Sequence, residues 1–187
     1  ISSKISYNKL KFIIKTFCII ILNISMIIHV LNKNTLIIDD FKLRCCVGKK
    51  GLNLNKKEGD QSTPKGLFKL KKLYFRKDRI GIPKCKLDKK VITKNLAWCD
   101  DSTQKEYNEE IKDFNNKSRE KFYRADNKYD YLITINQNEK KIPYKGSAIF
   151  LHLTDNYRPT AGCIALKKKN FEILLKLIDK DTKIKIG

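Results

Sequence analysis

The sequence of 187 residues has few of the side chains that usually build a metal centre. It contains only two histidines, and its six cysteines form neither a Cys-x-x-Cys repeat nor a cluster with histidine. A structural zinc site needs four such ligands at close spacing. We therefore expect no metal and no cofactor.

Acidic residues are scarce relative to basic ones, so the formal net charge is +21. Such a charge attracts polyanions in general, including nucleic acid, anionic lipid and acidic polymers. The basic residues are mostly lysines spread along the chain, and the sequence lacks an aromatic RNA-binding strand motif, a zinc finger and a basic leucine zipper. We therefore expect a solvated basic surface and no nucleic-acid partner.

The first 25 residues differ from the rest of the chain. Four lysines up to Lys15 precede an apolar run over residues 16–22, and a short polar end follows at 23–25. This layout is typical of an export signal or a membrane anchor. The alternative is that residues 1–25 are upstream sequence outside the native protein, since the only methionine is Met26 and the sequence after it already has the pattern of a folded domain.

Residues 26–187 are expected to form one domain, because they contain no internal repeat and no linker. Short apolar or alternating runs predict strands over 27–31, 35–38, 41–47, 67–75, 129–135, 147–153 and 182–186. Asn170 is placed to cap one amphipathic helix, whose apolar positions are Phe171, Leu174, Leu175 and Ile178. Residues 103–121 are expected to be an irregular insertion with at most a short helix. The fold class is therefore mainly β, with some helix (α+β).

Cys45 and Cys46 are neighbours in a predicted strand, so their side chains point to opposite faces and a disulfide between them would be strained. We expect them to be buried free thiols. Cys85 and Cys99 could form a disulfide if the domain is exported.

Two reactive side chains lie close together in the C-terminal third of the chain. His152 belongs to an apolar predicted strand, and Cys163 follows Gly162 after a loop that contains proline. A thiol nucleophile needs a base to take its proton and amide donors for the oxyanion it creates, and this segment offers both. A histidine and a cysteine at this spacing are more often packed in a core than catalytic, so a catalytic role depends on the motifs around them.

The surrounding motifs are Gly146-Ser-Ala-Ile-Phe-Leu-His152 with Pro159-Thr-Ala-Gly-Cys-Ile-Ala-Leu166 and, upstream, Gly48-Lys-Lys-Gly51, Lys57-Glu-Gly-Asp60, Thr63-Pro-Lys-Gly66 and Trp98-Cys-Asp-Asp101 before Tyr107-Asn108. Together they resemble L,D-transpeptidase (YkuD-like) catalytic domains of a compact bacterial branch. The resemblance covers about residues 26–187. It implies a β-sandwich of mixed sheets with short helices.

The resemblance also implies a reaction on peptidoglycan stem peptides in the periplasm or envelope of a bacterium. Cys163 would attack a donor tetrapeptide, release D-alanine and hold the stem as a thioester until an amine acceptor attacks. His152 would be the general acid and base, and the backbone N–H groups of Gly162 and Cys163 would bind the oxyanion. The expected substrate-binding residues are Arg158, Thr160, Trp98, Asp101 and Tyr107.

The sequence departs from the family pattern beside the cysteine. Ala161 stands where many relatives have a second histidine, and Ala165 stands where they have a basic or amide residue. Both changes remove groups that could bind a substrate carboxylate, and Arg158 is either a replacement cation or a solvated loop residue. Two alternative functions stay open, an L,D-carboxypeptidase that uses the same thioester and a noncatalytic basic protein that binds wall polymer. The oligomeric state is not predicted.

Overall fold

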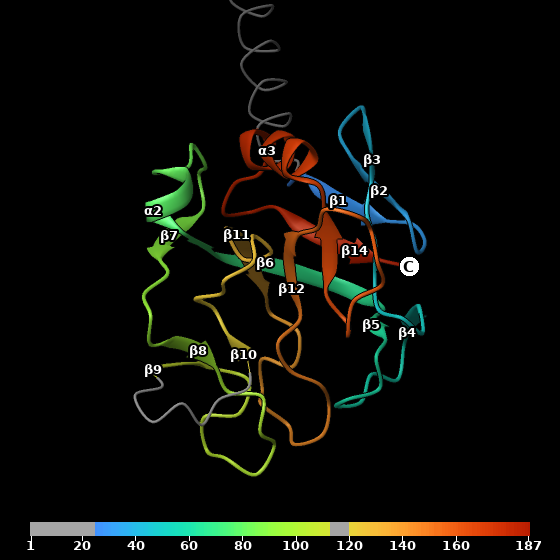
Figure 1. Cartoon of the computed structure of the whole chain (residues 1–187). Helices are drawn as coiled ribbons and strands as arrows, with labels where there is room; N and C mark the ends of the chain where they lie inside the picture. Colours follow the sequence, from blue (N-terminus) through green and yellow to red (C-terminus); the bar gives the residue numbers. More distant parts are fainter. Residues whose placement is uncertain (1–24, 113–119) are drawn as a thin grey trace, which may run out of the picture.

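The computed structural model describes residues 25–112 and 120–187. Within these residues the fold is mainly β, with two helices, α2 (Lys77–Ile80) and α3 (Lys168–Leu177) (Figure 1). All but the last residue of the predicted export signal or anchor over 1–25 lies outside the described residues. In the described part of the chain, no helix has the length and apolar character needed to cross a membrane.

The strands of the described residues are short, apart from one that spans ten residues. In chain order they are β1 (Ile27–Val30), β2 (Thr35–Ile38), β3 (Phe41–Arg44), β4 (Leu52–Asn53), β5 (Thr63–Pro64), β6 (Gly66–Phe75), β7 (Asp88–Val91), β8 (Leu96–Trp98), β9 (Glu110–Lys112), β10 (Glu120–Lys121), β11 (Tyr131–Ile135), β12 (Phe150–Leu153), β13 (Ile164–Leu166) and β14 (Lys183–Ile186).

A mixed sheet of nine strands, counted within the described residues, dominates the fold. Its order is β13-β12-β11-β6-β14-β1-β2-β3, and β7 also pairs with β6. The long strand β6 crosses the middle of the molecule (Figure 1) and pairs with β14 along its first part and with β11 along its second. Past β3, Cys46 and Ala165 exchange two backbone hydrogen bonds of 2.8 Å. The edges at β3 and β13 therefore meet, and the sheet is nearly closed.

Alternation along the strands sends side chains to two separate cores. Leu151 of β12 joins the larger core, in which Phe171 of α3 is completely buried. Phe150, the next residue along β12, joins a smaller aromatic cluster with Phe122 and Tyr129. Full burial of one such aromatic or aliphatic side chain stabilises the fold by about 1.5–3 kcal/mol. The smaller cluster also contains Cys163, so the thiol lies against a packed aromatic wall.

Most of the predicted strands are confirmed, with their ends shifted by a few residues. The predicted cap of the helix is wrong, because α3 begins at Lys168 after Lys167, and the Asn170 side chain instead donates to the carbonyl of Arg44 at 3.4 Å. The strand predicted over 147–153 begins only at Phe150.

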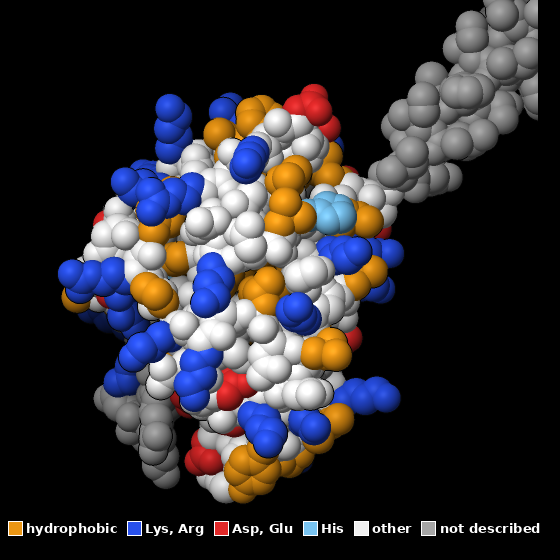
Figure 2. Space-filling model, turned by 90° about the vertical axis from the view of Figure 1, so that its right-hand side faces the viewer, with side chains coloured by type: hydrophobic (Ala, Val, Ile, Leu, Met, Phe, Trp, Pro, Cys, Tyr) orange, Lys and Arg blue, Asp and Glu red, His pale blue; other side chains and the backbone are white. Residues whose placement is uncertain are grey.

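The insertion predicted over 103–121 contains strands β9 and β10, with residues 113–119 outside the described part. Cys45 and Cys46 are buried free thiols, as predicted, and Cys85 and Cys99 are also free. The basic side chains do not gather into one patch on the face drawn in Figure 2, where lysine and arginine are dispersed among apolar and acidic groups.

Candidate active site

His152 and Cys163 are brought together by two adjacent parallel strands. In the register of β12 and β13, His152 lies opposite Ala165. Cys163 precedes Ala165 by two positions, so its side chain is on the same face of the sheet as that of His152. Both side chains line one cavity of about 480 Å³, and they are only 7% and 8% exposed. The structure therefore places the predicted base and nucleophile in a single pocket.

The Cys163 thiol is held by the backbone at the start of β12. Its Sγ accepts a hydrogen bond from the N–H of Phe150 at 3.3 Å and donates to the carbonyl of Ala148 at 3.2 Å. Ala148 has a φ of 51°, a left-handed conformation that is uncommon for a residue with a side chain. The residue is fixed there because its N–H donates to Asn108 Oδ1 at 3.1 Å.

The hydrogen bond of His152 defines its tautomer. Nδ1 lies 2.8 Å from the carbonyl oxygen of Leu153, and a carbonyl can only accept, so Nδ1 carries the hydrogen. In a neutral imidazole this leaves the lone pair on Nε2, which is the state needed to accept a proton. The ring also packs edge-on against Tyr129, with 5.3 Å between ring centroids.

Burial keeps both reactive groups uncharged in this arrangement. Burial lowers the pKa of His152 to about 4, and the nearby charges of Lys128 and Arg124 oppose protonation further. Burial raises the pKa of the Cys163 thiol to about 12, and the carboxyl group of Glu120 adds to this increase. At neutral pH the resting site therefore holds a thiol and a neutral imidazole rather than an ion pair.

The loop before Cys163 is fixed from both sides. Thr160 Oγ1 donates to the carbonyl of Cys163 at 2.6 Å and accepts the N–H of Gly162 at 3.1 Å. The predicted oxyanion donor at Gly162 is therefore engaged within the loop in this structure. A Cβ at position 162 would lie 3.0 Å from the backbone oxygen of Ser62 and 2.9 Å from Ile149 Cδ1, so a larger residue there would force both neighbours to shift.

Thr63 links this loop to the upstream motif, and its substitution is expected to destabilise the fold. Its buried Oγ1 donates to the carbonyl of Gly162 at 2.7 Å and accepts from the N–H of Gly48 at 2.8 Å. We expect Thr63→Val to lower the free energy of unfolding by about 1–3 kcal/mol, because two buried backbone groups lose their partner. Urea denaturation measures this, with the exposed Thr103→Val as a control; equal midpoints for the two variants would contradict it.

The remaining predicted substrate-binding residues divide into two groups. Arg158 and Thr160 line the cavity that holds the thiol. Trp98, Asp101 and Tyr107 are not among its described lining residues. Tyr107 is buried behind the wall with its hydroxyl on Glu58, and the Asp101 carboxylate accepts hydrogen bonds from Thr103 in an exposed turn. Their contact with substrate stays a prediction.

Three polar residues at the site were not predicted from sequence. Glu120 lines the cavity and accepts the Tyr129 hydroxyl at 2.7 Å. Lys56 also lines it, although its side chain is almost completely buried. Asn108 accepts the N–H of Ala148, whose carbonyl in turn accepts the Cys163 thiol. The sequence motifs include Asn108 and the residues next to Lys56, but the sequence alone does not show that the loops bring them close to the thiol.

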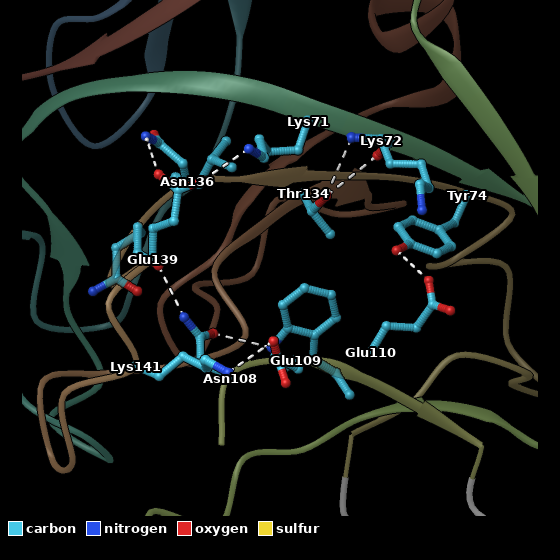
Figure 3. Close-up of a pocket in the computed structure, with 13 residues that line it drawn as sticks. Lys71, Lys72, Tyr74, Asn108, Glu109, Glu110, Thr134, Asn136, Glu139 and Lys141 are labelled. Carbon is cyan, nitrogen blue, oxygen red and sulfur yellow. Dashed lines mark hydrogen bonds and ion pairs between the residues drawn. The ribbon is translucent and has the colours of Figure 1, made fainter. Parts of the chain in front are cut away.

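A second cavity of about 490 Å³ has Asn108 among its lining residues (Figure 3). Asn108 Oδ1 accepts from Trp98 Nε1 at 3.0 Å, and its Nδ2 donates to the carbonyl of Gln137 at 2.9 Å. Two ion pairs join charged side chains around this cavity, Lys71 with Glu139 at 2.8 Å and Lys141 with Glu109 at 2.9 Å. The described residues that line this second cavity include no cysteine and no histidine. We therefore assign the candidate active site to the first cavity, which contains His152 and Cys163.

Comparison with known proteins identifies the family. The YkuD family, described as the L,D-transpeptidase catalytic domain, matches residues 19–186. The chain therefore belongs to this family, as its motifs predicted, and the predicted mainly β fold class is confirmed. The family implies an L,D-transpeptidase type of activity.

Two solved structures are similar to the chain. Bd1075 of Bdellovibrio bacteriovorus is 16% identical, with a TM-score of 0.46 and with 87% of this chain and 48% of that chain covered. The helical cell shape determining protein Pgp2 from Campylobacter jejuni is 17% identical, with a TM-score of 0.47 and coverage of 87% and 47%. The chain thus spans about half the length of these structures. No curated protein matches it.

Proposed function

We propose that this protein is a peptidoglycan L,D-transpeptidase that forms a thioester between Cys163 and a stem tetrapeptide. The observation that carries the proposal is the placement of the thiol and a neutral imidazole on one sheet face in one cavity. Membership of the YkuD family supports the reaction class. The stem peptide, D-alanine as leaving group and an amine as acceptor are the finer parts of the proposal.

In the acylation step, Cys163 Sγ attacks the carbonyl carbon that precedes the terminal D-alanine, and its proton passes to His152 Nε2. The thiol now donates to Ala148, so it must first rotate toward the imidazole. The carbonyl oxygen becomes an oxyanion, which the N–H of Cys163 can bind, joined by that of Gly162 if it leaves Thr160. The C–N bond then breaks, and the imidazolium returns the proton to the amine of the departing D-alanine.

In the second step an acceptor amine attacks the thioester carbonyl. His152 takes a proton from the attacking nitrogen and gives it to the sulfur as the C–S bond breaks, so the thiol is regenerated. Water in place of the amine gives the carboxypeptidase reaction with the same residues. The acceptor alone distinguishes these two outcomes.

Incubation with a disaccharide tetrapeptide and an excess of amine acceptor tests the proposal. We expect an adduct on Cys163 equal in mass to the donor minus D-alanine, together with free D-alanine and a cross-linked or exchanged product. D-alanine release without such a product would indicate a carboxypeptidase. Binding to wall polymer with neither adduct nor turnover would indicate the noncatalytic basic protein.

We further propose that the protein acts in the periplasm or at the cell envelope, where its substrate is found. The net charge of +21 supports attraction to anionic wall polymers, although it does not select among polyanions. Fractionation of the host bacterium tests this location, and recovery of the protein only with the cytoplasm would contradict it. An anchor through residues 1–25 is part of the same proposal.

A further inference from the structure

Lys56 is a charged residue buried beside the reactive cysteine. Its side chain is 7% exposed, yet it lines the same cavity as Cys163 and His152. A Cβ built on Gly162 would lie only 3.8 Å from Lys56 Nζ, so the ammonium group sits next to the residue that precedes the nucleophile. Lysine is rarely buried this deeply unless its charge has a partner or a task.

Asp60 is the charge partner of Lys56, and its carboxylate also accepts hydrogen bonds from other groups of the same loop. The ion pair joins Lys56 Nζ to Asp60 Oδ1. The same carboxylate accepts Ser62 N–H at 2.9 Å, Ser62 Oγ at 2.6 Å and Lys57 N–H at 3.0 Å. These bonds, together with that of Lys56, hold the pKa of Asp60 well below its usual range despite the opposing effect of burial. Asp60 therefore stays ionised and holds the buried ammonium group of Lys56 in its charged state beside the cavity.

Counted over residues 25–112 and 120–187, the ammonium group of Lys56 also has one N–H donor left over. It donates to the carbonyl of Lys57 at 2.9 Å and to Asp60, and an ammonium carries three N–H donors. Ser147 Oγ lines the same cavity and is buried without a partner at full hydrogen-bond distance in the described residues, and it faces the Tyr107 hydroxyl closely enough to lower the pKa of that group. Ser147 directly follows Gly146, where an added Cβ would contact the Lys56 side chain at 2.9 Å.

We propose that Lys56 and Ser147 form a carboxylate subsite of the active-site cavity, which receives the terminal carboxylate of the donor peptide. A carboxylate offers two acceptor oxygens, which match one ammonium N–H and one hydroxyl. The subsite supplies the carboxylate contact that Ala161 and Ala165 do not provide, and it rests on the proposed peptide substrate. Arg158 also lines this cavity but is exposed, so its side chain loses more conformational entropy on binding than the already ordered side chain of Lys56.

The test measures binding and turnover separately. Calorimetry on the full chain with Cys163→Ala compares a tetrapeptide donor that ends in D-alanine with the same donor as its C-terminal carboxamide. We expect the carboxylate to bind at least about tenfold more tightly, as for loss of one charge-assisted hydrogen bond. Adding Lys56→Met with Asp60→Asn, which removes both charges of the buried pair, should abolish this preference, whereas the neighbouring exposed Lys57→Met should keep it.

Equal affinity for the two donors, or a preference that survives the paired Lys56 and Asp60 substitution in a folded protein, would overturn the subsite. If Lys56 instead served the oxyanion, the same substitution would lower the turnover of both donors equally and leave the preference intact. Turnover of both donors is followed in parallel with Cys163 intact, in the unsubstituted chain and in the chain with the paired Lys56 and Asp60 substitution. A Lys56-dependent preference without turnover would keep the subsite and reject the proposed transpeptidase.

Discussion

Replacement of Cys163 by serine is expected to abolish the acyl adduct and to lower D-alanine release by at least about 1000-fold. The serine hydroxyl can keep the contacts with Phe150 N–H and the Ala148 carbonyl, so the fold should survive. Its oxygen is a far weaker nucleophile at neutral pH than sulfur beside a base. Intact-mass spectrometry after a short incubation with the tetrapeptide donor reads the adduct directly.

The matched control for this variant is Cys85→Ser. Cys85 is a half-buried free thiol, and it is not among the described residues that line the cavity of Cys163. This control should form the adduct at the rate of the unsubstituted chain. An adduct that persists in Cys163→Ser, at any cysteine, would place the nucleophile elsewhere.

Slow alkylation of Cys163 at neutral pH is the second large effect that we expect. With a thiol pKa of about 12, raised by burial and by Glu120, only about one molecule in 100,000 carries a thiolate at pH 7. The thiolate is the reactive species, so iodoacetamide should modify Cys163 at least about 1000-fold more slowly than it modifies glutathione. Peptide mapping over a time course separates Cys163 from the other cysteines.

The pH dependence distinguishes a neutral pair from an ion pair. The thiolate fraction of a thiol with a raised pKa increases about tenfold for each pH unit below that pKa, so alkylation should accelerate steadily from pH 7 to pH 10. An imidazolium and thiolate pair would instead react quickly and almost independently of pH between the two pKa values. A flat and rapid profile would mean that His152 takes the proton before any substrate binds.

The sequence predicted the parts of the fold that follow from local periodicity. Strand β6 alternates in exposure over residues 66–71, and α3 has apolar residues at helical spacing, so both were found. Ala148 was wrongly included in a strand because its local sequence is apolar. Its conformation is set by Asn108, a residue forty positions earlier, which takes the N–H that a strand would have paired.

The site likewise contains residues that the sequence predicted and residues that it did not. His152 and Cys163 were predicted because the motifs around them resemble YkuD-like catalytic domains, and the direct pairing of β12 with β13 brings them together. Lys56 was not, because its position beside Gly162 depends on the path of an irregular loop and on the hydrogen bonds of Asp60. Lysine is usually exposed, and no pattern in the sequence indicates that Lys56 is buried. Glu120 is likewise brought to the cavity by the pairing of β10 with β8.

The place of β14 in the sheet has a consequence for folding. This strand comes last along the described chain, but it lies between β1 and β6, near the middle of the sheet. Until residues 183–186 are available, β1 and β6 lack the strand between them, and the sheet is interrupted at that place. Contacts between such distant segments form slowly, because a long loop must close before they stabilise anything. We therefore expect the nine-stranded sheet to become continuous late in folding, only after residue 186 has been synthesised.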